Sequence, residues 1–204
     1  MSAVCGQIHA TVAGMRRHRF PFNAAELPDN GVYLLFEKGE RAHDGDRIVR
    51  VGSHTGPANL VQRLTEHFLV ENKDRSILRK NVGRALLARD GDPFIEQWEW
   101  DLTSKVSRDE HEGRVDAEKL EAVERRVTEY ITRNCSFVVL PAGRGKAARL
   151  TIEAGLIATV AQCRCCGPSA DWLGRFSPKA TIRRIGLWQI QHARGDPLAA
   201  FPPG

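Results

Sequence analysis

The sequence predicts a single mixed α+β domain, and three observations lead to that fold class. The chain of 204 residues is 42% hydrophobic and 27% charged, a composition that suits one globular domain with a substantial core. Short runs with the two-residue alternation of strands are interleaved with longer stretches that have the spacing of helices. The sequence contains no internal repeat, low-complexity tract or linker long enough to separate two domains.

Three short runs predict strands. The turn signal at 28–31 precedes VYLLFEKG, in which apolar residues alternate between two faces. The polar stretch GERAHDGD then leads into RIVRVGSH, so the two runs predict an antiparallel hairpin with a long loop. CSFVVLPAG predicts a third short strand that Pro141 and Gly143 end.

Helical spacing predicts the remaining regular structure. A helix after Pro57, one capped by Ser76 and ended by Gly91, and an amphipathic helix at 115–134 all have continuous apolar stripes. Two further helices are expected, at about 7–18 and at 147–163. The expected organisation is an N-terminal helical extension (1–28), the main domain (29–166), and a loop-rich C-terminal extension (167–204) that packs on the same domain.

Composition restricts the possible partners and locations. Thirty Lys and Arg residues against 25 Asp and Glu residues give a formal charge of +5, which favours a polyanionic partner without requiring one. The sequence has no apolar run near the ~20 residues that cross a bilayer and no signal-peptide pattern at its start. A cytoplasmic protein that does not enter membranes is therefore expected.

The five cysteines are an odd number, and three of them are crowded at Cys163, Cys165 and Cys166. This is not the pattern of a secreted disulfide framework, so reduced thiols are expected. CRCC with a distant His192 lacks the paired ligand spacing that is typical of zinc sites. Buried or incidental cysteines are therefore a better interpretation than a metal–thiolate site.

Glu153 is the most informative single position. On a helix it falls in the middle of the apolar stripe formed by Leu150, Leu156, Ile157 and Val160. A carboxylate taken out of water costs several kcal/mol unless a proton, a protein cation or a metal ion neutralises it. A buried salt bridge, or a helix end where the side chain reaches solvent, would also explain the pattern.

Other candidate residues allow two interpretations each. Arg63 and His67 share one edge of a helix, where they could hold a phosphate and move a proton, although such residues are often simply exposed. Tyr33 could present its hydroxyl to a site or pack in the core. Basic residues are expected on the exposed side of the 76–91 helix, where they could contact phosphates or only increase solubility. They are Arg75, Arg79, Lys80 and Arg84.

Taken in chain order, these residues resemble the core motifs of the GIY-YIG nuclease superfamily. Gly31-Val32-Tyr33 is similar to the first motif, and Arg50-Val51-Gly52 is similar to the second, with arginine where the family normally carries tyrosine. Arg63 and Glu153 match the family's arginine and metal-binding glutamate, and His67 matches a histidine that some members carry one helical turn after the arginine.

The resemblance covers about residues 29–163, and RKNVGRALL, SADWLGRFSP and GLWQIQH are similar to uncharacterised bacterial members. It implies a small central antiparallel sheet of about three strands flanked by helices. The family commonly has an asparagine after the metal glutamate, and the nearest candidate for that position here is Asp171.

The implied function is that of an endonuclease that hydrolyses phosphodiester bonds in nucleic acid, expected to be DNA, with one Mg²⁺ or Mn²⁺ ion. Glu153 would hold the metal, Tyr33 with His67 would accept a proton from water, and Arg63 would neutralise developing charge. Arg50 would support Tyr33. Arg79, Lys80 and Arg84 would bind substrate.

Two alternatives remain open. One is a catalytically inactive nucleic-acid-binding module that keeps the fold but has lost turnover with its second tyrosine. The other is an interaction protein unrelated to nucleic acid. The sequence leaves the oligomeric state open.

Overall fold

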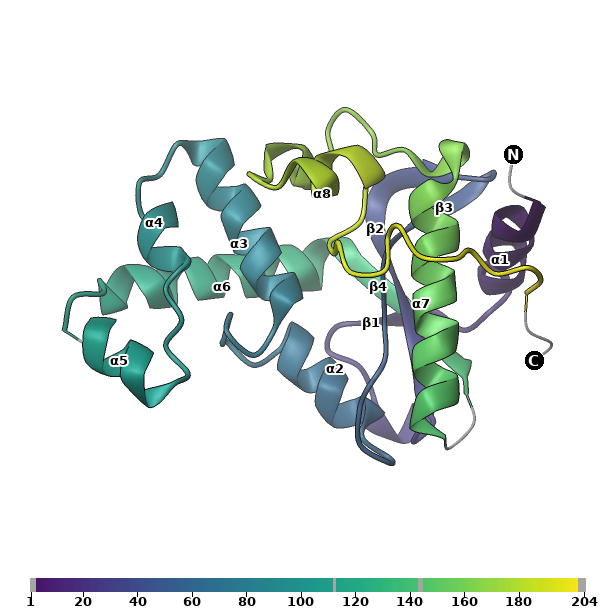
Figure 1. Ribbon diagram of the computed structural model, residues 1–204, viewed down its shortest axis with the longest axis horizontal. Helices are drawn as coiled ribbons and strands as arrows, with labels where there is room; N and C mark the ends of the chain where they lie inside the picture. The colour runs from purple at the N-terminus through teal and green to yellow at the C-terminus, as the bar shows by residue number, and fades with distance from the viewer. Residues whose placement is uncertain (1–2, 112, 143–144, 202–204) are drawn as a thin grey trace.

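The computed structural model describes residues 3–111, 113–142 and 145–201, and its centre is a four-stranded antiparallel sheet (Figure 1). The strand order is β1-β4-β2-β3, with bounds His18–Arg19 (β1), Gly31–Ala42 (β2), Gly45–Gly52 (β3) and Cys135–Pro141 (β4). The predicted α+β class is confirmed. The strand beyond the expected three is β1, which contributes only two residues at the edge.

The β2–β3 hairpin is longer and tighter than expected. Strand β2 continues through GERAHDGD as far as Ala42, and only His43 and Asp44 form the turn, so the prediction of a long loop is wrong. Both turn residues have positive φ angles, of 48° and 61°, as a two-residue turn that follows the twist of the strands requires. The hairpin thus has a tip at His43–Asp44 and an open end at Gly31 and Gly52.

Helices surround this sheet on both faces. Their bounds are Ala3–Ala13 (α1), Leu60–Phe68 (α2), Ile77–Asp90 (α3), Ile95–Trp98 (α4), Lys105–His111 (α5), Ala117–Asn134 (α6), Lys146–Gln162 (α7) and Ala180–Ile185 (α8). The predicted caps of α3 are confirmed, since the Ser76 side chain accepts from the Arg79 N–H and Gly91 is left-handed. The first helix begins and ends earlier than expected. Among the described helices, none is long and apolar enough to span a bilayer.

The two faces of β2 bury two separate cores. Tyr33 and Leu35 point into a core shared with α2, α3 and α6, which we call the Tyr33 face. Val32 and Leu34 point into a core shared with α1 and α7, which we call the α7 face (Figure 1). Because helices cover both faces of the sheet, alternate residues of VYLLFE point into two different cores, and neither set points to solvent.

The C-terminal segment 187–189 lies beside β3. The Trp188 N–H donates to the Val49 carbonyl at 2.8 Å, and the Val51 N–H donates to the Gln189 side chain at 3.2 Å. The segment therefore covers the free edge of the sheet. The two extensions expected at 1–28 and 167–204 include residues 1–2 and 202–204, which lie outside the described residues.

The three stretches RKNVGRALL, SADWLGRFSP and GLWQIQH meet in space. The Asn81 amide donates to the Trp188 carbonyl at 3.0 Å. The indole N–H groups of Trp172 and Trp188 both donate to the buried carboxylate of Glu37, at 3.1 and 2.9 Å. These contacts attach the C-terminal residues to the Tyr33 face of the sheet.

Candidate active site

Both motif glycines lie at the open end of the hairpin, and a side chain would not fit at either position. Tyr33 pairs with Gly52 across β2 and β3, and a Cβ added to Gly52 would come 2.5 Å from the Tyr33 Cζ atom. A Cβ on Gly31 would come 2.8 Å from the Leu140 carbonyl oxygen. The tyrosine ring is therefore held directly over the Gly52 backbone, which fixes the position of its hydroxyl.

Arg50 lies beside that hydroxyl. Its Nε donates to the Tyr33 oxygen at 3.2 Å, and its Nη1 donates to the Trp188 carbonyl at 3.4 Å. Arg50 is 6% exposed and Tyr33 is fully buried. The Arg50 guanidinium thus contacts the Tyr33 hydroxyl directly and gives it a positive neighbour.

His67 lies next to Tyr33 on the same face. The ring centroids are 6.3 Å apart, and Nδ1 of His67 is 2.7 Å from the Ser76 hydroxyl. Burial, followed by the positive charges of Arg50 and Arg63, holds the pKa of His67 well below its usual range. His67 is thus a buried neutral imidazole at pH 7, and its interpretation as an exposed surface residue is wrong.

Arg63 lies one helical turn before His67 on α2 and is the exposed member of the group. Its side chain is 35% exposed, and Nη1 has only long contacts, at 3.5 Å to the Glu66 carboxylate and 3.4 Å to the Arg75 carbonyl. These contacts are at the limit of hydrogen bonding, so the guanidinium can exchange them for phosphate oxygens at small cost.

Glu153 reaches the open end from α7. Its carboxylate accepts a hydrogen bond from the Ser53 hydroxyl, and Ser53 directly follows Gly52. Within the described ranges, no ion pair to Glu153 is found. Of the predicted apolar stripe, Leu156, Ile157 and Val160 are buried, but Leu150 is 40% exposed. Glu153 itself is half-buried, and Arg149, one turn before it, is buried.

These donors suit a hard divalent cation. The Glu153 carboxylate and the Ser53 hydroxyl offer oxygen atoms, and Mg²⁺ characteristically binds through one or two carboxylates together with substrate phosphate and water. The sequence reasoning missed Ser53. Its position immediately after the second motif, Arg50-Val51-Gly52, is the sequence feature that could have indicated it.

A set of hydrogen bonds fixes the loop that carries Ser53. The buried Arg149, one turn before Glu153, donates from Nη2 to the carbonyls of His54 and Gly56 at 3.4 Å each. His54 Nδ1 donates to the Gly56 carbonyl at 2.6 Å, which leaves Nε2 to accept from the Gly31 N–H at 3.4 Å. Burial lowers the pKa of His54, which favours this neutral form. Arg149 was also missed, although its spacing from Glu153 places both on one helix face.

Arg79, Lys80 and Arg84 of α3 do not form an exposed surface. Arg79 is fully buried and binds the Glu124 carboxylate of α6 at 2.8 and 2.7 Å, and Arg84 is 5% exposed and binds Glu99. Lys80 is half-buried against the Asp74 carboxylate at 3.1 Å. The prediction of an exposed basic face is therefore wrong for Arg79 and Arg84, because acidic residues distant in sequence pair with them.

Asp171, the expected counterpart of the family's asparagine, lies elsewhere. It is exposed and lines a hollow with Glu37, Tyr130 and Trp172. Tyr33, Arg50, Arg63 and Glu153 do not line this hollow. The structure thus brings Tyr33, Arg50 and His67 into one cluster, holds Glu153 beside Gly52 through Ser53, and leaves Asp171 apart.

The four-stranded antiparallel sheet with helices on both faces defines an α+β domain. A family model described as a GIY-YIG domain matches residues 2–200. The chain therefore belongs to the GIY-YIG family, whose members are generally nucleases. No curated protein and no solved structure matches the chain.

Proposed function

We propose that this protein is an endonuclease that hydrolyses phosphodiester bonds of DNA with the help of one Mg²⁺ or Mn²⁺ ion. The observation that carries the proposal is the arrangement about Gly52. Tyr33, in contact with Arg50, covers this glycine, and the next residue, Ser53, binds Glu153. Tyr33, the proposed proton acceptor, thus lies at Gly52, and Glu153, the proposed metal ligand, is bound to the next residue of the same strand end.

Each side chain has a role that its surroundings support. Arg50 donates to the Tyr33 oxygen and so holds in place the hydroxyl that would accept a proton from water. Arg63, with its partly exposed guanidinium, balances the charge that develops on the phosphate. Glu153 would hold the metal, which would supply further positive charge to the reacting phosphate and its leaving group.

The test is a nicking assay on supercoiled plasmid with Mg²⁺, Mn²⁺ or no metal. Glu153→Gln and Arg63→Ala are each expected to lower the rate by about 100-fold or more while the thermal midpoint stays unchanged. Glu121→Gln and Arg125→Ala, at exposed positions of α6, are the matched controls and should cleave normally. Full activity of Glu153→Gln would reject the metal assignment.

The complete burial of Tyr33 favours a second candidate, a nucleic-acid-binding module without turnover. Such a module would bind DNA with an affinity that falls steeply with salt, because binding releases counterions. It would produce no nicked plasmid with any metal. The binding and nicking assays on the same preparation therefore separate the two functions.

A further inference from the structure

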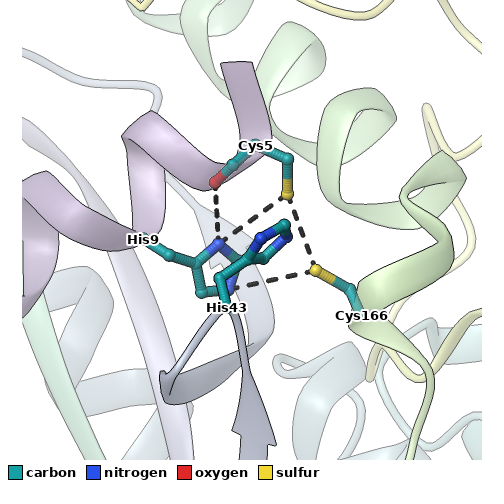
Figure 2. Close-up of side chains that lie close together, drawn as sticks. All are labelled: Cys5, His9, His43 and Cys166. Atoms are coloured by element: carbon teal, nitrogen blue, oxygen red, sulfur yellow. Dashed lines mark hydrogen bonds between the residues drawn. The ribbon is translucent and has the colours of Figure 1, made fainter. Parts of the chain in front are cut away.

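A second group of side chains converges at the tip of the hairpin, away from the motif residues. Figure 2 shows Cys5, His9, His43 and Cys166 pointing toward one another. One ligand atom from each, a thiol sulfur or a ring nitrogen, lies within 4.8 Å of all the others. They come from α1, from the β2–β3 turn and from the short helix Arg164–Cys166 after α7, segments as far as 161 residues apart.

The separations between the ligand atoms are close to the edges of a tetrahedral metal site. The Cys5 and Cys166 sulfurs are 3.6 Å apart, and the Cys166 sulfur is 4.0 Å from Nε2 of His9. Tetrahedral zinc, with Zn–S near 2.3 Å and Zn–N near 2.0–2.1 Å, places its ligand atoms about 3.3–3.8 Å apart. The sulfurs are well beyond the bonded length of about 2.05 Å, and the described cysteines form no disulfide.

Local structure orients each ligand. Cys5 and His9 lie four residues apart and so share one face of α1. His9 Nδ1 is 3.0 Å from the Cys5 carbonyl, to which it can donate, and this leaves Nε2 facing Cys166 at 4.0 Å. Such a backbone contact is the usual way in which a metal-bound histidine is held.

His43 completes the group from the hairpin tip. Its φ of 48° lies in the left-handed region, where histidine is enriched but where most non-glycine residues are strained. The His43 ring centroid lies 4.7 Å from that of His9. The turn conformation thus places this imidazole against α1.

Burial and donor chemistry suit a metal ion at this place. Cys5, His9 and Cys166 are at most 3% exposed, and both cysteines belong to the core of the α7 face. Cysteine binds a metal as the thiolate, which the bound cation stabilises. Two sulfurs and two imidazoles are borderline-soft donors that select zinc over Mg²⁺.

We propose that Cys5, His9, His43 and Cys166 bind one structural zinc ion. All four positions of a tetrahedral shell are filled by protein, so this metal ties α1, the hairpin tip and the segment after α7 together and has no open position for catalysis. Cys163, 3.3 Å from the Nε2 atom of His43, is the neighbour that could compete for His43. The proposal does not depend on the proposed nuclease function.

The test is metal analysis of the full chain, purified without chelator from zinc-supplemented cells. About one zinc ion per chain is expected, with near-complete loss in Cys5→Ser and Cys166→Ser. Cys135→Ala and His192→Asn change a cysteine and a histidine outside the cluster, and they should retain the metal. Retention of zinc in Cys166→Ser with its loss in Cys163→Ser would overturn the ligand set.

A second measurement keeps the test valid if the cysteine variants fold poorly. The wild-type chain, depleted of zinc and titrated with Co²⁺, should develop thiolate-to-cobalt absorption that saturates at one equivalent and disappears when zinc is added. No zinc in the purified protein and no such absorption would overturn the proposal. So would a metal-free protein in which mass spectrometry finds Cys5 joined to Cys166.

Discussion

The two ends of the β2–β3 hairpin differ in chemistry and in connectivity. The open end gathers oxygen donors and Arg50 about Gly52. Its Glu153, and Arg63 on α2, are partly exposed to solvent. The tip gathers sulfur and imidazole in a buried cluster. Hard donors with exposed positions suit an ion that is shared with a substrate, whereas enclosed soft donors suit an ion that only holds the fold. One hairpin can thus carry a reactive end and a structural end.

The largest expected effects come from one variant at each end, each of which should lose the property that the other retains. Cys166→Ser should lose the tip metal and several kcal/mol of stability, because the free energy of binding structural zinc is folding free energy, yet it should still nick plasmid below its lowered thermal midpoint. Glu153→Gln should show the opposite, with zinc and midpoint retained and nicking lost. Thermal melts and plasmid assays on both variants check this. Simultaneous loss of both properties in either variant would contradict the separation.

Gly52→Ala tests the close contact at the open end. The new Cβ would meet the Tyr33 ring, and such overpacking costs about 1–3 kcal/mol. Denaturant unfolding should report that loss, with the zinc content unchanged. Gly167→Ala, where a Cβ has nothing within 4 Å and φ is −62°, is the matched control and should unfold at the wild-type midpoint.

Arg50→Ala tests the support given to Tyr33. Removal of the guanidinium should lower the nicking rate by about 10-fold, because Tyr33 loses the charged donor that holds its hydroxyl in place. The nicking rate of the purified variant checks this. An unchanged rate would show that Tyr33 does not rely on Arg50.

The buried neutral His67 predicts loss of stability in acid. Its folded pKa is below that of the unfolded chain, so below about pH 6.5 the unfolded state binds more protons and stability falls as the pH falls, by up to about 1.4 kcal/mol per unit. Above that pH the contribution is constant. Urea unfolding at pH 5 and pH 7.5 should show a smaller difference in His67→Gln than in the wild type. The exposed His192→Asn should match the wild type.

Local pattern was enough to predict most of the sheet and the longer helices. The candidate residues of the open end came instead from the resemblance to a family, and Ser53 and Arg149 were missed. The caps at Ser76 and Gly91 and the alternation in β2 depend on neighbouring residues, which a sequence displays directly. The short turn at His43 was missed because the polar residues of GERAHDGD look like a loop, although they pair across the hairpin.

Features that depend on distant partners could not be predicted. Arg79 is buried because Glu124, 45 residues away, neutralises it, and no local pattern indicates that pair. The tip cluster was missed for the same reason. The spacing of Cys5 and His9 was visible, but only the fold brings Cys166 and His43 to them.

The backbone contacts of segment 187–189 have a consequence for how the protein is made. Arg50 and its partner Trp188 are 138 residues apart, so Arg50 leaves the ribosome long before Trp188 has been synthesised. Until then β3 has an uncovered edge, and Tyr33 and Arg50 lack the carbonyl and the side chains that enclose them. Completion of this region is therefore a late step in the biogenesis of the chain.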